Sequence, residues 1–344
     1  MSRPRPPAGV EVGPGSPLPH GPGTSRPPGP ATVLPMVQAA GAVCWRPARG
    51  GDDLEVLLVH NARHGEWSWP KGKAAVRESL PECALREVSE ETGVLALLGR
   101  PLGTVAYHLR NGRPKTVTYW AGRPTATRRP TADTDEIDDR AWVDPDKAER
   151  MLAHRGDLAP LDRLLALARE GTLDTRPFVV VRHGQARPRD AWSRADAERP
   201  LVAKGRRQAL AISGLLQCWR PSYLVSSPWR RCTETMGPYA AASGTRLRTK
   251  GSLTEDGFHR NPHKVVQRVN ALLRRDQPSL LCTHRPLLGA VVDTLAAAAP
   301  DDARDGLPAA DPWLRPGELL VAHVARGLRE STDRVVAVER FSPG

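Results

Sequence analysis

The stretch GKAAVRESLPECALREVSEETGV, residues 72–94, decides the fold of the first half of the chain. It holds five glutamates in a chain whose formal net charge is +12. Ser79 and the glutamate three residues later form a capping-box pattern, and Gly93 stands where a helix commonly ends in a left-handed residue. The stretch therefore predicts a well-bounded helix over 79–92.

Three of these glutamates share one face of the predicted helix. Glu87 and Glu91 are four residues apart, and Glu90 is three from Glu87. Like charges at these spacings destabilise an isolated helix by roughly a few tenths of a kcal/mol per pair. A hard divalent cation such as Mg²⁺ removes that repulsion and takes carboxylate oxygens as ligands. A solvated acidic face also fits three glutamates, so the surrounding pattern must decide.

The surrounding pattern favours the metal site. Gly72, five residues, Glu78, seven residues and the run REVSEETGV from Arg86 to Val94 match the Nudix box at every fixed position. So many fixed positions at set spacing make a specific motif. The first half of the chain thus resembles the Nudix hydrolases, which cleave a nucleoside diphosphate linked to a further group.

This resemblance implies roles for the matching residues. It implies that a divalent cation, Mg²⁺ or alternatively Mn²⁺, is held by Glu87, Glu90 and Glu91, while Gly72 lets its loop close on the metal. Arg86 would orient the carboxylates and contact substrate. One of the three glutamates, which we assign as Glu90, or a more distant glutamate would activate water.

Three further residues are candidates for the same site. The lead-in WSWPKGK (67–73) resembles that of Nudix enzymes acting on dinucleoside polyphosphates and oxidised guanine nucleotides, and it places Lys71 to meet a phosphate oxygen. Tyr107 is a candidate for stacking on a base, although an aromatic residue on a strand also fits the core. Glu136, in TDEIDDRAW, is a candidate extra metal ligand or base, or else part of an ordinary acidic turn.

The second half of the chain alternates short apolar runs with helical segments. The runs are FVVV (178–181), YLVS (223–226) and LLCT (280–283). Such alternation predicts a mostly parallel sheet covered on both faces. Polar residues follow each run, and the carboxyl ends of parallel strands form the ligand crevice of such sheets, so we expect these residues to converge there.

The residues at those strand ends suit phosphoryl transfer. Arg182, His183 and Gly184 follow the first run, the second leads into a helix with Arg231, and His284 follows the third. This order resembles the histidine phosphatase superfamily, and in particular its short SixA-like branch. The resemblance implies that His183 is the phosphorylated nucleophile, that Arg182, Arg231 and His284 form the phosphate pocket, and that Glu255 supplies the acid.

One feature departs from that family. A glycine commonly follows the second histidine, whereas this chain has Arg285-Pro286. The phosphatase half could therefore be narrow in substrate, weak, or a module that holds a phosphorylated ligand without turnover.

Four segments follow along the chain. Residues 1–35 are rich in Pro and Gly and predict a disordered tail. Residues 36–148 predict the Nudix domain, an α/β/α sandwich around a mixed sheet. A linker helix is predicted over 149–175, and an α/β histidine phosphatase domain with a mostly parallel sheet over 176–340.

Composition limits the compartment and the partners. Lys plus Arg total 50 against 38 Asp plus Glu, which suits anionic partners, although the basic residues are scattered and a compositional bias fits as well. Five isolated cysteines indicate a reducing compartment, and no apolar run suits a signal peptide or a membrane span. We therefore expect a cytoplasmic protein without membrane contact.

The order of the two domains resembles that of two-domain MutT-type enzymes of actinobacteria. This resemblance implies Mg²⁺-dependent hydrolysis of nucleoside polyphosphates, above all 8-oxo-(d)GTP to the diphosphate, with a second phosphatase centre that uses a phosphohistidine. Hydrolysis of diadenosine polyphosphates and pyrophosphate removal from RNA 5′ ends remain alternatives. Nucleoside polyphosphates are the expected partners and nucleic acid is not. Contact between the Nudix and phosphatase domains of neighbouring molecules is also predicted.

Overall fold

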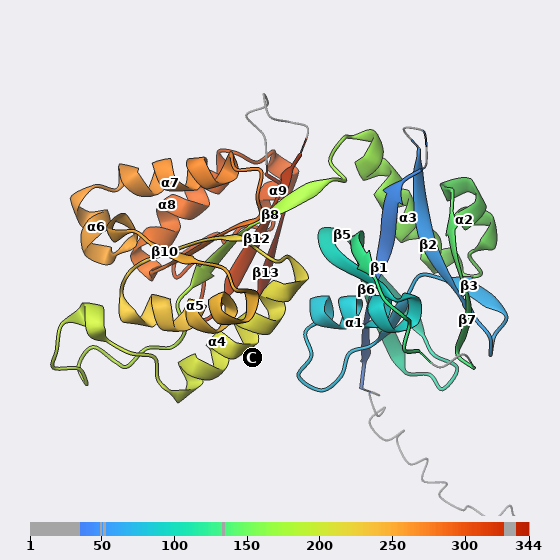
Figure 1. The fold of residues 1–344 in the computed structure, drawn as a ribbon, viewed down its shortest axis with the longest axis horizontal. Coiled ribbons are helices and arrows are strands. Elements are labelled where there is room, and N and C mark those ends of the chain that lie inside the picture. Colours follow the sequence, from blue (N-terminus) through green and yellow to red (C-terminus); the bar gives the residue numbers. More distant parts are fainter. Residues whose placement is uncertain (1–34, 49, 51–52, 133–134, 327–334, 344) are drawn as a thin grey trace, which may run out of the picture. The chain divides into compact units, whose positions relative to one another are not determined.

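The computed structural model describes residues 35–48, 50, 53–132, 135–326 and 335–343. The predicted tail, residues 1–35, lies outside the described residues except for Pro35. From Pro35 onward the chain forms one compact unit that contains two β-sheets (Figure 1).

The first sheet is mixed, as predicted. Its main path runs in the order β3-β2-β1-β6-β5, with β4 paired to β1 and β7 paired to β2. The pair β1 and β6 is parallel and the others are antiparallel. The strands are β1 (Val37–Pro47), β2 (Leu54–Asn61), β3 (Glu66–Ser68), β4 (Lys71–Lys73), β5 (Val94–His108), β6 (Pro114–Thr127) and β7 (Ile137–Val143).

Helices cover both faces of this sheet, which confirms the predicted α/β/α sandwich. Alternate residues of a strand point to opposite faces. Accordingly, Ala40 and Ala42 of β1 share a cluster with Val88 of α1 (Leu80–Thr92). Ala39 and Val43 instead cluster with apolar residues of α3 (Arg155–Arg169).

The segment predicted as a linker, residues 149–175, contains the end of α2 (Pro145–Met151) and the whole of α3. Leu161, Leu164 and Leu167 of α3 are at most 2% exposed, and they pack against the first sheet. This helix is therefore one layer of the first domain. The apolar spacing predicts an amphipathic helix but does not say which surface the helix covers.

The second sheet is mostly parallel, as predicted. Its order is β10-β9-β11-β8-β12-β13. The first four strands in that order run parallel, β12 runs antiparallel to β8, and β13 runs antiparallel to β12. The strands are β8 (Thr175–Arg182), β9 (Tyr223–Ser226), β10 (Leu247–Thr249), β11 (Ser279–Thr283), β12 (Leu319–Ala325) and β13 (Val335–Phe341).

Helices also cover both faces of the second sheet (Figure 1). Val179 and Val181 of β8 cluster with α4 (Ala203–Leu215) and α5 (Arg230–Ser243). Val180 of β8 clusters with α7 (His263–Leu273) and α8 (Arg285–Ala296). The short helices α6 (Glu255–Arg260) and α9 (Asp301–Arg304) complete this half.

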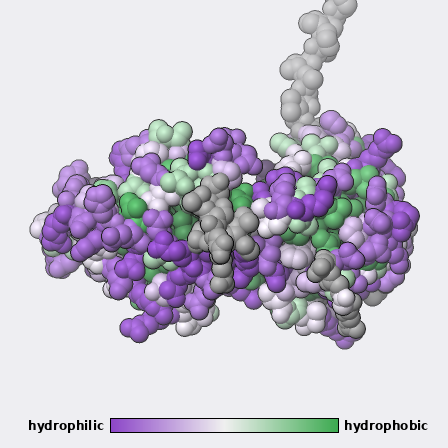
Figure 2. Space-filling model, turned by 90° about the horizontal axis from the view of Figure 1, so that it is seen from above, coloured by the Kyte–Doolittle hydropathy of each residue, from purple (hydrophilic) through white to green (hydrophobic). Residues whose placement is uncertain are grey.

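In the described part of the chain, no helix combines the length and the apolar character that a membrane crossing needs. The face drawn in Figure 2 is mostly hydrophilic, with apolar residues in small patches.

Candidate active sites

The acidic helix α1 forms as its sequence predicts. The Ser79 hydroxyl accepts a hydrogen bond from the Glu82 backbone N–H at 3.4 Å, and the Glu82 carboxylate accepts one from the Ser79 N–H at 3.3 Å. Gly93 ends the helix with a left-handed φ of 74°. These local bonds fix where the helix begins and ends, and with it the rotation of its acidic face.

Arg86 gathers three carboxylates around one guanidinium. Two of its nitrogens donate to the two oxygens of Glu78, at 2.7 and 2.9 Å. Its Nη1 donates to Glu87 at 2.8 Å and to Glu90 at 2.9 Å. These bonds to Arg86 lower the pKa of Glu78, whereas burial outweighs them at Glu87 and raises its pKa. Arg86 therefore orients the acidic cluster.

Glu91 is the most deeply placed of the helix carboxylates. Its Oε2 accepts from the backbone N–H of Lys71 at 3.0 Å. Burial raises the pKa of Glu91 to about 8, although the nearby charge of Lys71 opposes this shift. A buried carboxylate whose close partner is a backbone N–H suits a cation that brings its own charge.

Gly72 lies against the same cluster, at a place where the backbone leaves no room for a larger side chain. Its strand β4 pairs with β1, and Gly72 faces Ala40 across the pair. A Cβ at this position would overlap the carboxylate of Glu87. The glycine therefore lets the backbone approach the acidic helix closely.

Glu136 lies just before β7 and is exposed. Its negative charge is one of the smaller contributions that raise the pKa of Glu91. The described residues contain no ready-made group of three metal-ligating side chains. Glu87 and Glu90 instead bond to Arg86.

A cavity of about 970 Å³ adjoins this cluster through Lys71. Tyr107 borders the cavity and is 40% exposed, so it is not a core residue. The Lys115 ammonium lies 5.6 Å from the centre of its ring. An exposed aromatic ring and two cations on one cavity wall suit a ligand that is both flat and anionic.

Asp157 also borders the cavity, and sequence reasoning missed it. The residue is 6% exposed, and its Oδ1 accepts a hydrogen bond from the Tyr119 hydroxyl at 3.3 Å. Its Oδ2 has no hydrogen-bond partner. Asp157 lies in the first turn of α3, inside the segment that was expected to link the domains. An aspartate in an unbroken helical pattern gave no signal of a site.

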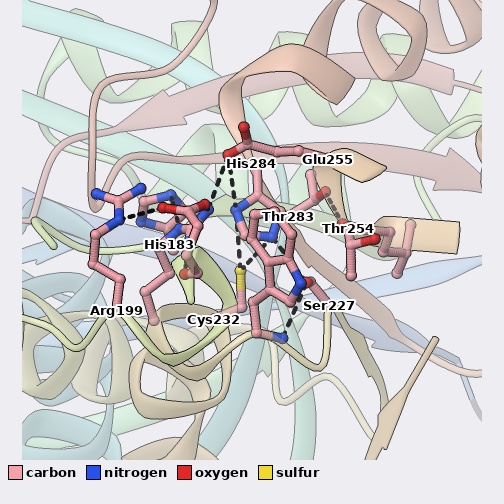
Figure 3. Close-up of polar contacts among 12 residues, drawn as sticks. His183, Arg199, Ser227, Cys232, Thr254, Glu255, Thr283 and His284 are labelled. Carbon is pink, nitrogen blue, oxygen red and sulfur yellow. Dashed lines mark hydrogen bonds and ion pairs between the residues drawn. The ribbon is translucent and has the colours of Figure 1, made fainter. Parts of the chain in front are cut away.

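The second site lies at the carboxyl ends of the parallel strands, as predicted. His183 follows β8 and His284 follows β11, and their ring centroids are 5.1 Å apart. Glu255, the first residue of α6, reaches the same place (Figure 3). Its Oε1 lies 3.7 Å from Nδ1 of His284.

Two hydrogen bonds determine the tautomer of His183. Its Nδ1 lies 2.8 Å from the carbonyl oxygen of Gly184, which can only accept. Its Nε2 lies 3.2 Å from Nε of Arg231, which can only donate. The proton is therefore on Nδ1, and Nε2 carries the lone pair. Burial, aided by Arg231 and other cations, lowers the pKa of His183 to about 3, so the ring is neutral at pH 7.

Arg231 is fully buried and is bound on every side. Its Nη2 donates to Glu255 at 2.9 Å and to Asp196 at 3.1 Å. Its Nη1 donates to the Asp196 carbonyl at 2.8 Å. Two carboxylates thus offset the cost of burying this guanidinium beside His183.

His284 is held equally firmly. Its Nε2 lies 2.8 Å from the hydroxyl of Ser227, which directly follows β9, and its ring stands edge-on to Trp229 with centroids 4.8 Å apart. Burial holds the pKa of His284 well below its usual range. Both histidines are therefore neutral bases in a rigid frame.

A cavity of about 470 Å³ opens in front of His183. Arg182 borders it and is held by a bond from Nη1 to the Leu314 carbonyl at 2.6 Å. Arg285, the unusual residue after His284, forms an ion pair with Asp311 at the same cavity. Guanidinium groups around a neutral imidazole suit a phosphoryl group.

The segment 187–199 contributes residues that the sequence did not reveal. Arg189 and Arg199 border the cavity, and Asp196 binds both of them and Arg231. This segment, RPRDAWSRADAER, resembles the rest of an arginine-rich chain, so no local pattern distinguishes it.

These two sites define a chain that joins two families of hydrolytic enzymes. Residues 36–165 match the NUDIX domain, and residues 178–276 match the histidine phosphatase superfamily (branch 1). The chain belongs to the Nudix hydrolases and carries a histidine phosphatase domain after the Nudix domain. Nudix hydrolases generally use a divalent metal ion such as Mg²⁺ and act on nucleotide substrates.

A relative from Mycolicibacterium smegmatis (strain ATCC 700084 / mc(2)155), described as an "8-oxo-(d)GTP phosphatase", is 33% identical over 264 residues. The match covers 75% of this chain and 80% of that protein. An "RNA pyrophosphohydrolase" from Erythrobacter litoralis (strain HTCC2594) is 29% identical over 106 residues, covering 26% of this chain and 65% of that protein.

Solved structures resemble each half separately. The phosphohistidine phosphatase SixA from Nakamurella multipartitia, itself described as putative, is 21% identical, with a TM-score of 0.36, and covers 49% of this chain and 97% of that one. An Ap4A hydrolase from C. elegans is 23% identical, with a TM-score of 0.33, and covers 39% of this chain and 98% of that one.

Proposed function

We propose that this chain hydrolyses 8-oxo-(d)GTP to the diphosphate at the α1 site, and that its second domain is a phosphatase with a phosphohistidine intermediate. The observation that carries the proposal is the 33% identity to the mycobacterial 8-oxo-(d)GTP phosphatase across 80% of that protein. The acidic face of α1 beside a large cavity supports it.

The donor set of α1 fits a hard divalent cation. Glu87, Glu90 and Glu91 would hold Mg²⁺, or alternatively Mn²⁺, with Glu136 as a further ligand and Gly72 making room. When bound, such an ion neutralises phosphate charge and lowers the pKa of a coordinated water. Glu90, whose side chain is 40% exposed against 13% for Glu87, is the residue we assign to take a proton from the attacking water.

The cavity supplies the remaining contacts of the nucleotide. The backbone N–H of Lys71 bonds to Glu91, and the ammonium charge of Lys71 opposes the rise in the pKa of Glu91, so this ammonium suits a phosphate oxygen near the acidic cluster. Arg86, besides orienting the carboxylates, is assigned to the phosphate as well. The exposed ring of Tyr107, with Lys115 beside it, is assigned to stack on the base.

Asp157 gives this cavity a means of recognising an oxidised purine. Oxidation of guanine at C8 places a hydrogen on N7, which changes that atom from an acceptor to a donor. A carboxylate only accepts when ionised, and one oxygen of Asp157 has no partner. Asp157 therefore favours the N7–H of 8-oxoguanine and disfavours the N7 lone pair of guanine.

A substitution tests this role directly. In Asp157→Asn the amide can either accept or donate, so we expect the preference for 8-oxo-dGTP over dGTP, measured as the ratio of kcat/KM, to fall about tenfold. Tyr119→Phe is the matched control, since it removes the neighbouring hydroxyl and keeps the carboxylate. An unchanged ratio in Asp157→Asn would remove Asp157 from base recognition.

The second site is assigned to phosphoryl transfer by its own residues. The lone pair on Nε2 of His183 attacks phosphorus, while Arg182 and Arg231 bind the phosphoryl oxygens. Glu255 donates a proton to the leaving oxygen and His284 steadies the phosphoryl group. Water then releases phosphate from His183.

One experiment separates the two activities. A panel of nucleotides is incubated with Mg²⁺ in H₂¹⁸O with the wild type, Glu91→Gln and His183→Ala. The position of the heavy oxygen shows which phosphorus is attacked, and each variant silences one site. The proposal fails if 8-oxo-dGTP is not turned over faster than dGTP, or if neither variant changes the products.

Diadenosine polyphosphate and RNA 5′-end hydrolysis, and a phosphatase half that only binds its ligand, are not favoured, because the relative that spans most of the chain is an 8-oxo-(d)GTP phosphatase. We propose a cytoplasmic location, since all five cysteines are free, which suits a reducing compartment. Contact between Nudix and phosphatase domains of neighbouring molecules stays a prediction.

A further inference from the structure

A second cavity lies beside the phosphate pocket of the histidine phosphatase domain. It has a volume of about 540 Å³, and it shares two bordering residues with the 470 Å³ cavity, Arg189 and Glu255. These two side chains form an ion pair with an N–O distance of 2.5 Å. The Arg189–Glu255 pair therefore forms part of a partition between the two cavities.

The second cavity has aromatic walls. Trp192 borders it, and its indole N–H donates to the Ala195 carbonyl at 3.0 Å. Trp229 borders it too, is 9% exposed and is held between the ring of His284 and the Arg231 guanidinium, which lies 4.5 Å from its centroid. Trp192 is the more accessible of the two indoles, and the buried Trp229 forms part of the cavity wall.

Charged groups stand around those walls. Arg194 and His259 border the cavity and supply a cation and an imidazole ring. Asp256 supplies a hydrogen-bond acceptor. The remaining carboxylate, Asp196, is bound by arginines. Flat aromatic surface with a cation beside it is the pattern that binds a base carrying a phosphate.

The position of this cavity matches that of a leaving group. His183 borders the first cavity, which is where the proposed function places the phosphorus that Nε2 attacks. In an in-line displacement the leaving oxygen departs on the side opposite the nucleophile. Glu255, the assigned proton donor, borders both cavities, so the group that it protonates lies between them.

We infer that the cavity walled by Trp192 and Trp229 is the leaving-group subsite of the second active site, and that it takes a nucleoside monophosphate. This inference rests on the proposed function, since it uses His183 as the nucleophile. The substrate class of the second site is then a nucleoside diphosphate whose terminal phosphoryl group enters the first cavity.

The step balances without further reactants. Nε2 of His183 forms a bond to the terminal phosphorus, and the bond from that phosphorus to the bridging oxygen breaks. Glu255, once released from Arg189, binds a proton from water on Oε2 and passes it to the bridging oxygen, which leaves on the nucleoside monophosphate. Because Arg189 occupies Oε2 of Glu255 in the structure, the incoming phosphate must draw Arg189 away from the carboxylate.

Phosphohistidine formation by the full-length chain tests the subsite. The substrates are a nucleoside diphosphate labelled with ³²P at its terminal phosphate, and labelled acetyl phosphate, whose leaving group has no aromatic part. We expect Trp192→Ala to lower kcat/KM for labelling by the diphosphate about tenfold, the loss of one stacked base. Labelling by acetyl phosphate should change less than about twofold. Trp192→Phe keeps an aromatic face and should restore most of the loss.

The outcomes are distinct. Equal losses with both donors, or no loss with either, overturn the subsite. If acetyl phosphate does not label the wild type, the assignment of His183 as nucleophile fails instead. Binding of labelled nucleoside monophosphate, measured by equilibrium dialysis, then decides the subsite, which survives only if Trp192→Ala binds less tightly than wild type.

Discussion

Both active sites suit a ligand that carries phosphate, but the side chains of the two sites carry opposite charges. The α1 site presents the carboxylates of Glu87, Glu90 and Glu91, with one guanidinium among them. The second site presents guanidinium groups around a neutral histidine. A phosphate approaching the first site needs a cation from solution, whereas the second site has its cations built into the chain.

The charged side chains of the second site are also more deeply buried than those of the first. Arg231 and His284 are 0% exposed, while the side chain of Glu90 is 40% exposed. Apart from the Arg189–Glu255 ion pair, the second site is therefore ordered before any ligand binds, which favours electrostatic stabilisation of a transition state with little rearrangement. If Glu87 and Glu90 hold an ion as we propose, they must exchange their bonds to Arg86 for bonds to that ion, so the order of the first site depends on what it binds.

The largest expected effect comes from removing the nucleophile of the second site, which should leave the first site active. His183→Ala removes the lone pair that attacks phosphorus, so we expect labelling of the chain as phosphohistidine to fall at least about 10³-fold. Turnover at the α1 site should stay within about twofold. His263→Ala, an exposed histidine on α7, is the matched control and should label normally. Labelling that persists in His183→Ala would show that His183 is not the nucleophile of the second site.

The next effect tests the dependence on a cation. Glu91→Gln removes a buried carboxylate, so we expect calorimetry to show weaker Mg²⁺ binding and turnover at the α1 site to fall about 10²- to 10³-fold. Phosphohistidine formation should not change. Glu149→Gln, on an exposed surface of α2, is the control. If Glu91→Gln binds Mg²⁺ as tightly as wild type, the acidic face is not the metal site.

The same contrast explains what the sequence could and could not predict. Helix α1 was predicted because capping by Ser79 and the spacing of its glutamates are local. The strand ends that carry His183 and His284 were predicted because parallel sheets gather such ends at one edge. Asp157 and Arg189 were not, because only tertiary packing brings them to their sites.

A substitution at Gly72 should affect the α1 site alone, through steric overlap. In Gly72→Ala the new methyl group would overlap the Glu87 carboxylate, so that carboxylate must move. We expect turnover at the α1 site to fall about tenfold through misplacement of one ligand, with a higher Mg²⁺ requirement. Gly237→Ala, in helix α5 with open space around its Cβ position, is the control and should not change either activity. Wild-type Mg²⁺ dependence in Gly72→Ala would mean that Glu87 is not a ligand.

The smallest expected effect is that of pH on the second site. The rate of phosphohistidine formation should stay nearly constant as the pH falls. Burial lowers the pKa of His183 to about 3, so its Nε2 remains unprotonated down to acid pH. Phosphohistidine formation from acetyl phosphate, followed in a single turnover, should change less than about twofold between pH 7.5 and 5 through this group. A histidine with the usual pKa of about 6.5 would lose roughly thirtyfold over that range. The unfolded chain binds this proton and the folded one does not, so folding stability should decline as pH falls below about 6.5. Part of that decline should be absent in His183→Ala, with the part due to His284 remaining. A thirtyfold acid loss in labelling would contradict the burial of His183 that the structure shows.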